Sequence, residues 1–194
     1  MQDFHQICGP KKCCDDVVLE EVVQLAVEIA REGREGRKIG TLFVVSDEKK
    51  VLKRSRPLIL DPLYGHPDEK KRISDPDMRE TVKELAQLDG AFVVSGTGVV
   101  ISAARYINAS SRRIELPLGL GSRHVAAASI SRDTQAIAVV VSESSVVRIF
   151  NMGKLVTEII PEIWLFGKEN FKIPGPREER TVADVRIVSV KPTG

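Results

Sequence analysis

Residues 122–150 read SRHVAAASISRDTQAIAVVVSESSVVRIF. The alanine-rich part of this stretch, 122–131, predicts a helix. The continuous apolar run 136–142 predicts a buried central strand. Residues 143–145 form a turn, and 146–150 predicts a strand that pairs back beside the first. A helix followed by a buried strand and a hairpin is typical of a sheet covered by helices.

The rest of the chain extends the same pattern. Apolar residues recur at helical spacing over 17–32, where Asp15 and Asp16 can cap the start and Gly33 can end the helix. A buried strand is predicted at 39–46, then a turn at 47–50 and a short returning stretch at 51–53. Four prolines interrupt 54–77, which predicts a long connection. Asp77 and Glu80 resemble a capping box for a helix over 78–88.

Two further strands, 91–95 and 99–103, flank a Gly96-Thr97-Gly98 turn. Residues 105–118 are basic and predict an irregular segment, and 185–190 predicts one added strand near the C-terminus. The fold class is therefore α/β, a layered domain with a mixed central sheet covered by helices.

Composition excludes several classes of protein. The 194 residues are 42% hydrophobic and 29% charged, as in ordinary globular domains. The net charge of +2 is too small to indicate a nucleic-acid or membrane partner. No apolar run is as long as the roughly 18 residues that a helix needs to span a bilayer. The three cysteines lie within the first 14 residues, so no disulfide framework is predicted and a cytoplasmic location is expected.

The N-terminal residues 1–16 are expected to form a tail. His5, Cys8, Cys13 and Cys14 could gather around zinc, but their spacing matches no standard zinc motif. An exposed or loosely docked tail is the alternative.

Three places combine turn geometry with polar groups. In Asp89-Gly90-Ala91 a carboxylate stands between a helix and a strand, and Gly90 permits close backbone approach; the alternative is an ordinary turn. Ser142-Glu143 follows the most buried strand, where ligands of α/β sheets bind and where a carboxylate can hold a divalent ion. The alternative is a hairpin turn with a solvated Glu143.

The third place is Gly119-Leu120-Gly121-Ser122-Arg123-His124, a glycine-rich loop entering a helix. Free N–H groups and the helix dipole favour an anion there. Ser122 can cap the helix or donate to a phosphate, Arg123 can chelate two phosphate oxygens, and His124 can donate a hydrogen bond. The spacing is neither a Walker loop nor a Rossmann fingerprint. The alternative is that Ser122 only caps the helix while Arg123 and His124 are solvated.

These residues in this order resemble the nucleotide-cyclising domain of DisA-type proteins, the diadenylate cyclase (DAC) domain. The family carries Asp-Gly-Ala, a hydroxyl-Arg-His-Arg helix start and a buried strand ending in Ser-Glu. They are matched by Asp89-Gly90-Ala91, Ser122-Arg123-His124-Val125 and Ser142-Glu143. The resemblance covers roughly 39–155, and residues 40–45 and 56–66 are similar to the archaeal branch. It implies a cyclase domain over 17–165 and a C-terminal extension over 166–194.

The resemblance implies an enzyme that condenses two ATP into the second messenger cyclic di-AMP, releasing two pyrophosphates, in a homodimer or larger homo-oligomer with facing sites. It implies Asp89 and Glu143 as catalytic residues and as ligands of Mg²⁺ or Mn²⁺. The residues implied to bind ATP are Gly90, Ala91, Gly121, Ser122, Arg123, His124 and Ser142.

One position departs from the family pattern. Val125 stands where the second arginine of the helix motif is found. One charge-assisted phosphate contact is therefore missing unless Arg105, Arg112, Arg113 or Arg132 replaces it. A catalytically degenerate module that binds ATP or cyclic di-AMP is the alternative function.

Overall fold

The computed structural model of the chain describes residues 14–110, 114, 116–117, 119–161, 177–182 and 185–190. Its helices are α2 (Asp16–Glu32), α3 (Glu48–Lys53), α4 (Pro76–Leu85) and α5 (Ser122–Asp133), with a 3-10 turn at Asp68–Lys71. Its strands are β1 (Thr41–Val45), β2 (Ser55–Pro57), β3 (Ala91–Val94), β4 (Val100–Ile107), β5 (Ile137–Val141), β6 (Val147–Asn151), β7 (Lys154–Pro161), β8 (Arg177–Val182) and β9 (Val185–Val190).

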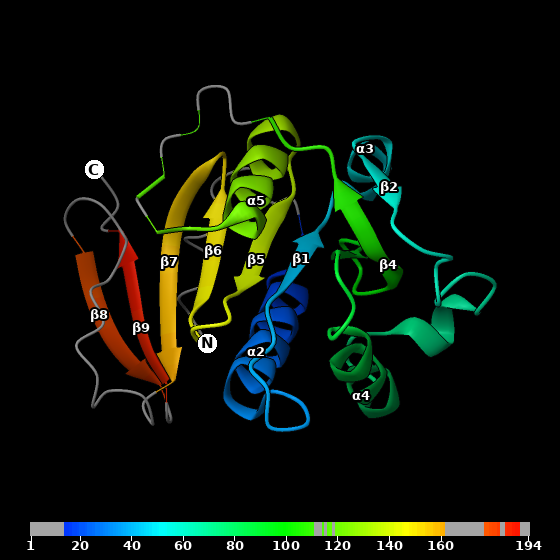
Figure 1. Cartoon of the computed structure of the whole chain (residues 1–194), viewed down its shortest axis with the longest axis horizontal. Coiled ribbons are helices and arrows are strands. Elements are labelled where there is room, and N and C mark those ends of the chain that lie inside the picture. Colours follow the sequence, from blue (N-terminus) through cyan, green and yellow to red (C-terminus); the bar gives the residue numbers. More distant parts are fainter. Residues whose placement is uncertain are drawn as a thin grey trace.

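The described strands form one mixed sheet in the order β2-β4-β3-β1-β5-β6-β7-β9-β8, which runs across the whole molecule (Figure 1). Only the β1–β3 pair is parallel among them. The predicted α/β class with a mixed sheet is therefore confirmed. Strand β9 was expected, but β8 and β7 were not.

Two apolar cores lie on opposite faces of the sheet. Consecutive residues of a strand point to opposite faces. Phe43 and Phe92 accordingly pack with α2 and α4, and their rings stack at 5.1 Å between centroids. Val44 and Val140 pack on the other face, with α3 and α5. The sheet is thus covered on both sides, which explains why every residue of β1, β3 and β5 is buried and why all of them except Thr41 are apolar.

Helix ends follow their capping residues, with one correction. The Asp15 side chain accepts from the Val17 amide, and Gly33 ends α2 at φ +60°, as predicted. Helix α4 begins earlier than predicted. The Asp75 side chain accepts from the amides of Asp77 and Met78, and Pro76 is the first helical residue. The predicted Asp77 cap is therefore wrong.

Three further segments differ from the predictions. Residues 48–53 form the short helix α3 rather than a returning strand, because Asp47 at φ +47° turns the chain and its carbonyl accepts from the amide of Val51. Residues 105–107 complete β4 rather than an irregular segment. Residues 154–161 form β7, which pairs with β6.

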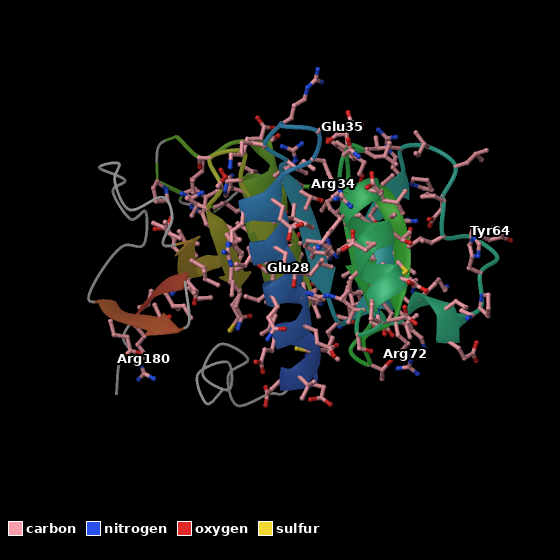
Figure 2. The ribbon with its side chains drawn as sticks, turned by 90° about the horizontal axis from the view of Figure 1, so that it is seen from below. Glu28, Arg34, Glu35, Tyr64, Arg72 and Arg180 are labelled. Carbon is pink, nitrogen blue, oxygen red and sulfur yellow. The ribbon has the colours of Figure 1, made fainter. Side chains whose placement is uncertain are left out.

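Ion pairs join α2 and the turn that follows it to α4 on one face. Arg79 Nη2 lies 2.6 Å from Glu28 Oε1, and Arg34 Nη2 lies 2.7 Å from Glu84 Oε1. Figure 2 shows Glu28 on α2 and Arg34, just after the end of α2, beside α4. These pairs fasten the two helices together and lie away from the polar motifs described next.

The N-terminal expectations lie mostly outside the described residues, since His5, Cys8 and Cys13 are not among them. Cys14 is buried. Among the described helices, none has the length and apolarity needed to cross a membrane. The boundary at 165 also lies outside the described residues, and the domain limits stay a prediction.

Candidate active site

Strand directions bring the three motifs to one end of the sheet. Leu42 near the start of β1 pairs with Ala91 at the start of the parallel β3. Thr41 pairs with Val141 at the end of the antiparallel β5. The residues just before β1 and β3 and just after β5 therefore meet at the same end of these neighbouring strands, which we call the site edge. Asp89 and Glu143 lie there, although 54 residues separate them (143 − 89).

Arg123 joins the two carboxylates. It comes from the first turn of α5, whose N-terminus lies at the site edge. Its Nη1 is 3.0 Å from Glu143 Oε1, and its Nη2 is 3.6 Å from Asp89 Oδ1. Both carboxylates are largely exposed, with side chains 82% and 69% accessible. The groups that were predicted to bind phosphate and metal therefore form one cluster that is open to solvent.

The glycine of the Asp-Gly-Ala motif is required by the chain itself. Gly90 has φ +111°, and a Cβ there would lie 2.6 Å from the carbonyl carbon of Ala104. Ala104 itself is left-handed at φ +51°, in an irregular part of the β3–β4 ladder. The Asp89 side chain accepts from the Gly90 amide at 2.9 Å. The close backbone approach predicted for Gly90 is therefore an approach to the backbone of β4.

Gly40 is a site residue that the sequence analysis did not single out. A Cβ at Gly40 would lie 2.7 Å from Arg123 Nη1 and 3.1 Å from Glu143 Cγ. The absence of a side chain therefore leaves the space in which Arg123 reaches Glu143. A glycine directly before a buried strand was the signal available in the sequence.

The first turn of α5 is open to an anion. Its N-cap is Gly121, which supplies no side-chain hydrogen bond, and Ser122 is the first helical residue. The alternative in which Ser122 only caps the helix is therefore wrong. An uncapped N-terminus leaves backbone N–H groups available to a bound anion. Ser122 and Arg123 stand at this end of the helix.

Two cavities adjoin at this turn, because both are lined by Ser122 and Arg123. The larger has a volume of about 310 Å³, and Asp89, Gly90 and Ala91 contribute to its lining. Most of the remaining lining is apolar and was not predicted. This apolar wall includes Leu58, Tyr106, Ile107, Val125 and Ala126.

The smaller cavity, of about 210 Å³, is more polar. It is lined by Gly119, Gly121, Ser122, Arg123, His124, Val140, Val141, Ser142 and Glu143. Ser142 lies in the tight turn after β5, where its hydroxyl is 2.7 Å from that of Ser144. Both the glycine-rich loop and the Ser-Glu turn thus contribute to one polar hollow.

His124 is buried rather than solvated. Its residue surface is 7% accessible, and its ring packs edge-on against Phe150. Burial is the main cause that lowers the pKa of His124 from 6.5 to about 4. The charge of Arg148 lowers it further, and the Gly121 carbonyl partly opposes the shift. His124 therefore lines the cavity as a neutral ring at pH 7.

This burial predicts a pH dependence of stability. The unfolded chain binds a proton at His124 below pH 6.5, whereas the folded chain does so only near pH 4. The free energy of unfolding should therefore fall as the pH drops through this window, by about 3 kcal/mol in total. Urea unfolding at pH 7, 6, 5 and 4 measures it. The His124→Gln variant should lack this pH-dependent contribution. The control variant His66→Gln, at an exposed histidine, should retain it. Parallel curves for wild type and His124→Gln would contradict the assignment.

The arginines that could replace the missing family arginine differ in their distance from the site. Arg105 lines the larger cavity, but its Nε donates to Ser55 Oγ at 2.8 Å and burial lowers its pKa. Arg132 lies in the last turn of α5 and pairs with Asp133, a helix length away from Ser122. Arg112 and Arg113 lie outside the described residues. Arg105 is therefore the only one of the described candidates at the site.

The donor set suits a divalent ion shared with a ligand. The described residues contain no group of three or more His, Cys, Asp or Glu side chains that could hold a metal by themselves. Asp89 and Glu143 supply two carboxylates. Mg²⁺ is commonly held by one or two carboxylates together with substrate phosphates and water. The pair fits such an ion only when a phosphate-bearing ligand completes the coordination.

Comparisons with known proteins identify the family of the chain. The family model described as DisA bacterial checkpoint controller nucleotide-binding matches residues 28–155, which contain all three polar motifs. A diadenylate cyclase of Methanocaldococcus jannaschii is 48% identical over 144 residues, 74% of this chain and 45% of its own. A diadenylate cyclase of Haloferax volcanii is 42% identical over 153 residues, 77% of this chain and 55% of its own.

The chain spans about half the length of these curated relatives. A solved structure of a Bacillus cereus protein, described as a hypothetical membrane spanning protein, aligns with a TM-score of 0.52 at 20% identity. It covers 71% of this chain and 61% of its own, and it shares the fold. The family match extends over more than half of the chain and ends at the residue where the predicted resemblance ends. The chain therefore belongs to the DisA nucleotide-binding (DAC) family.

Proposed function

We propose that this chain is a diadenylate cyclase, which condenses two ATP molecules into cyclic di-AMP and releases two pyrophosphates. The observation that carries the proposal is the position of Arg123. Its guanidinium lies between Asp89 and Glu143, at an open helix N-terminus and between an apolar and a polar cavity. The names of the two archaeal relatives support the same activity.

The two cavities match the two ends of ATP. The apolar wall of the larger cavity suits a purine base, and Tyr106 offers it an aromatic face. The triphosphate would then cross the first turn of α5, where Ser122, Arg123 and the backbone N–H groups donate to it. Gly90 and Ala91 would contact the nucleotide through the backbone, and Gly121 and Ser142 would bound the phosphates.

The reaction forms a bond between a 3′-oxygen and the α-phosphorus of the other ATP. The bond from that phosphorus to the bridging oxygen breaks, and pyrophosphate leaves. Asp89 would accept the proton of the attacking hydroxyl. Arg123 would exchange its carboxylate partners for phosphate oxygens when ATP enters. Asp89 and Glu143 would hold Mg²⁺ or Mn²⁺, which neutralises charge on the phosphates.

Two ATP molecules must meet, whereas each chain offers one such site among its described residues. Because Asp89 and Glu143 are exposed at the site edge, a second chain can present its nucleotide to them face to face. We therefore propose a two-fold dimer, or a larger assembly of such pairs, as the active form. The amount of product per chain should therefore rise with protein concentration.

A cytoplasmic location stays a prediction.

The first test is direct. The purified chain is incubated with ATP and either Mg²⁺ or Mn²⁺, and cyclic di-AMP is sought by mass spectrometry. Product from the wild type supports the proposal. ATP binding without product, with both metals and at high protein concentration, would instead favour a module that binds ATP or cyclic di-AMP. Val125, in place of the family arginine, is the observation that favours this second candidate.

Restoring the family arginine should tighten binding. Val125 lines the larger cavity beside Ser122 and Arg123, so Val125→Arg adds a donor to the site. A charge-assisted hydrogen bond contributes about 1.5–3 kcal/mol, which corresponds to roughly tenfold or more in the Kd for ATP. Calorimetry compares this variant with Val125→Met, which adds length without charge. An unchanged Kd would mean that another group, such as Arg105, already fills the role.

Gly40→Ala should impair turnover while the fold persists. The added Cβ meets the flexible end of Arg123 and the Cγ of Glu143, so Arg123 is displaced from its place between the carboxylates. Misplacing a reacting group by about 1 Å can cost up to roughly 100-fold in rate. Turnover and the melting temperature are measured together, with the exposed Lys38→Ala as control. Wild-type turnover in Gly40→Ala would show that the position of Arg123 in the empty site is unimportant.

A further inference from the structure

A charged pair is buried beneath the first turn of α5. Arg148 of β6 and Glu158 of β7 are register partners, and Arg148 Nε lies 2.6 Å from Glu158 Oε1. Their side chains are 8% and 1% accessible. Arg148 also pairs in register with Val140, which belongs to the core on the α5 side. The pair thus lies between the sheet and α5, and neither residue lines the two cavities.

Packing alone does not explain this pair. Its neighbours on the same face, Ala138, Val140 and Phe150, are apolar and fully buried. Desolvating two charges is costly, and an apolar pair of similar volume is often as stable or more stable. The charges therefore point to a role other than holding β6 against β7.

The second contact of Arg148 indicates that role. Its Nη1 lies 3.4 Å from His124 Nε2, across 24 residues of sequence. A guanidinium can only donate hydrogen bonds, so Nε2 must accept and the proton of the neutral ring must be on Nδ1. Nδ1 is itself buried, without a hydrogen bond of normal geometry to the described residues. The ring of His124 is thus held from the sheet side through Nε2.

We propose that Arg148 and Glu158 are positioning residues of this site. Glu158 orients Arg148, Arg148 holds His124 by Nε2, and the fixed ring sets the first turn of α5 so that the adjacent Arg123 reaches Asp89 and Glu143. The inference rests on the proposed function for its kinetic consequence. The geometry of the array is independent of that function.

The kinetic test replaces both charges together. Arg148→Met/Glu158→Leu replaces both charges by apolar side chains of similar volume and so avoids leaving one charge of the pair buried alone. The chain should therefore fold with a melting temperature close to the wild type. Its Kd for ATP should rise at least tenfold and its turnover should fall. The control is Arg79→Met/Glu28→Leu, which removes a more exposed pair of the same 2.6 Å length on the opposite face. Lys83 also loses Glu28 in this control but keeps Glu32 and Glu80 as partners. Glu158→Gln keeps an acceptor for Arg148 but leaves the buried charge of Arg148 without its counter-charge. Its melting temperature should therefore fall, whereas the double variant should keep it.

A spectroscopic test does not depend on the activity. The ¹⁵N shifts of the histidine rings distinguish the two neutral tautomers, and the chain has only three histidines, so the His124→Gln variant assigns the signal. The wild type should show the Nδ1–H tautomer at His124, and the double variant should lose it. An Nε2–H tautomer in the wild type, or wild-type ATP binding and turnover in the folded double variant, would overturn the proposal. If the wild type had no cyclase activity, only the proposed function would be overturned. The ATP affinity of the double variant and the tautomer of His124 would still test whether Arg148 and Glu158 position the site.

Discussion

Asp89→Asn is expected to reduce cyclic di-AMP formation by roughly 100- to 10,000-fold while the fold and ATP binding are retained. The asparagine oxygen can still accept from the Gly90 amide, as Asp89 Oδ1 does at 2.9 Å, so the motif keeps its conformation. The amide can neither take the proton of the 3′-hydroxyl nor serve as an anionic metal ligand. The proposed phosphate donors lie on α5 and are left unchanged by the substitution. Mass spectrometry measures product, and calorimetry measures the Kd for ATP.

Asp77→Asn is the matched control, since Asp77 is an exposed aspartate in the first turn of α4. It should leave turnover unchanged. A mixture of wild type and Asp89→Asn offers a second readout. In a mixed pair one of the two 3′-oxygens still attacks, so a linear dinucleotide should accumulate. Near wild-type product from Asp89→Asn alone would remove Asp89 from the reaction.

Arg123→Gln should weaken ATP binding by at least about 100-fold. Each charge-assisted hydrogen bond that Arg123 gives to phosphate contributes about 1.5–3 kcal/mol, and its fork can give two. In the empty site the expected effect on metal is opposite. Arg123 is the cation between Asp89 and Glu143 at 3.6 and 3.0 Å, so its removal leaves both carboxylates to a divalent ion. Mn²⁺ alone should therefore bind more tightly to Arg123→Gln than to the wild type.

Calorimetric titrations with ATP and with Mn²⁺, each in the absence of the other, separate the two effects. Arg132→Gln is the control on the same helix, because Arg132 lies in the last turn and pairs with Asp133. It should change neither affinity. Unchanged ATP affinity in Arg123→Gln would place the triphosphate elsewhere. Unchanged Mn²⁺ affinity would show that the two carboxylates do not share an ion.

The elements that were predicted well are those whose signal is local and long. Helix α2 repeats its buried apolar residues at helical spacing from Val18 to Ala30 and has its own N-cap and C-cap, and β5 is an unbroken apolar run. The failures are short or depend on a neighbour. Helix α3 has six residues, too few for a helical period to be visible. Strand β8 is charged throughout most of its length and becomes a strand by pairing with β9.

The sequence by itself determined the α/β class, the order of the three motifs and the family, because residue type and spacing are local properties. Only the tertiary structure decided that Asp89 and Glu143 share Arg123, since their proximity depends on the opposite directions of β3 and β5. The tertiary structure also decided that the ring of His124 is buried. Whether a ring at a helix start meets water or Arg148 depends on which sheet face the helix covers, and Arg148 lies 24 residues away in the chain.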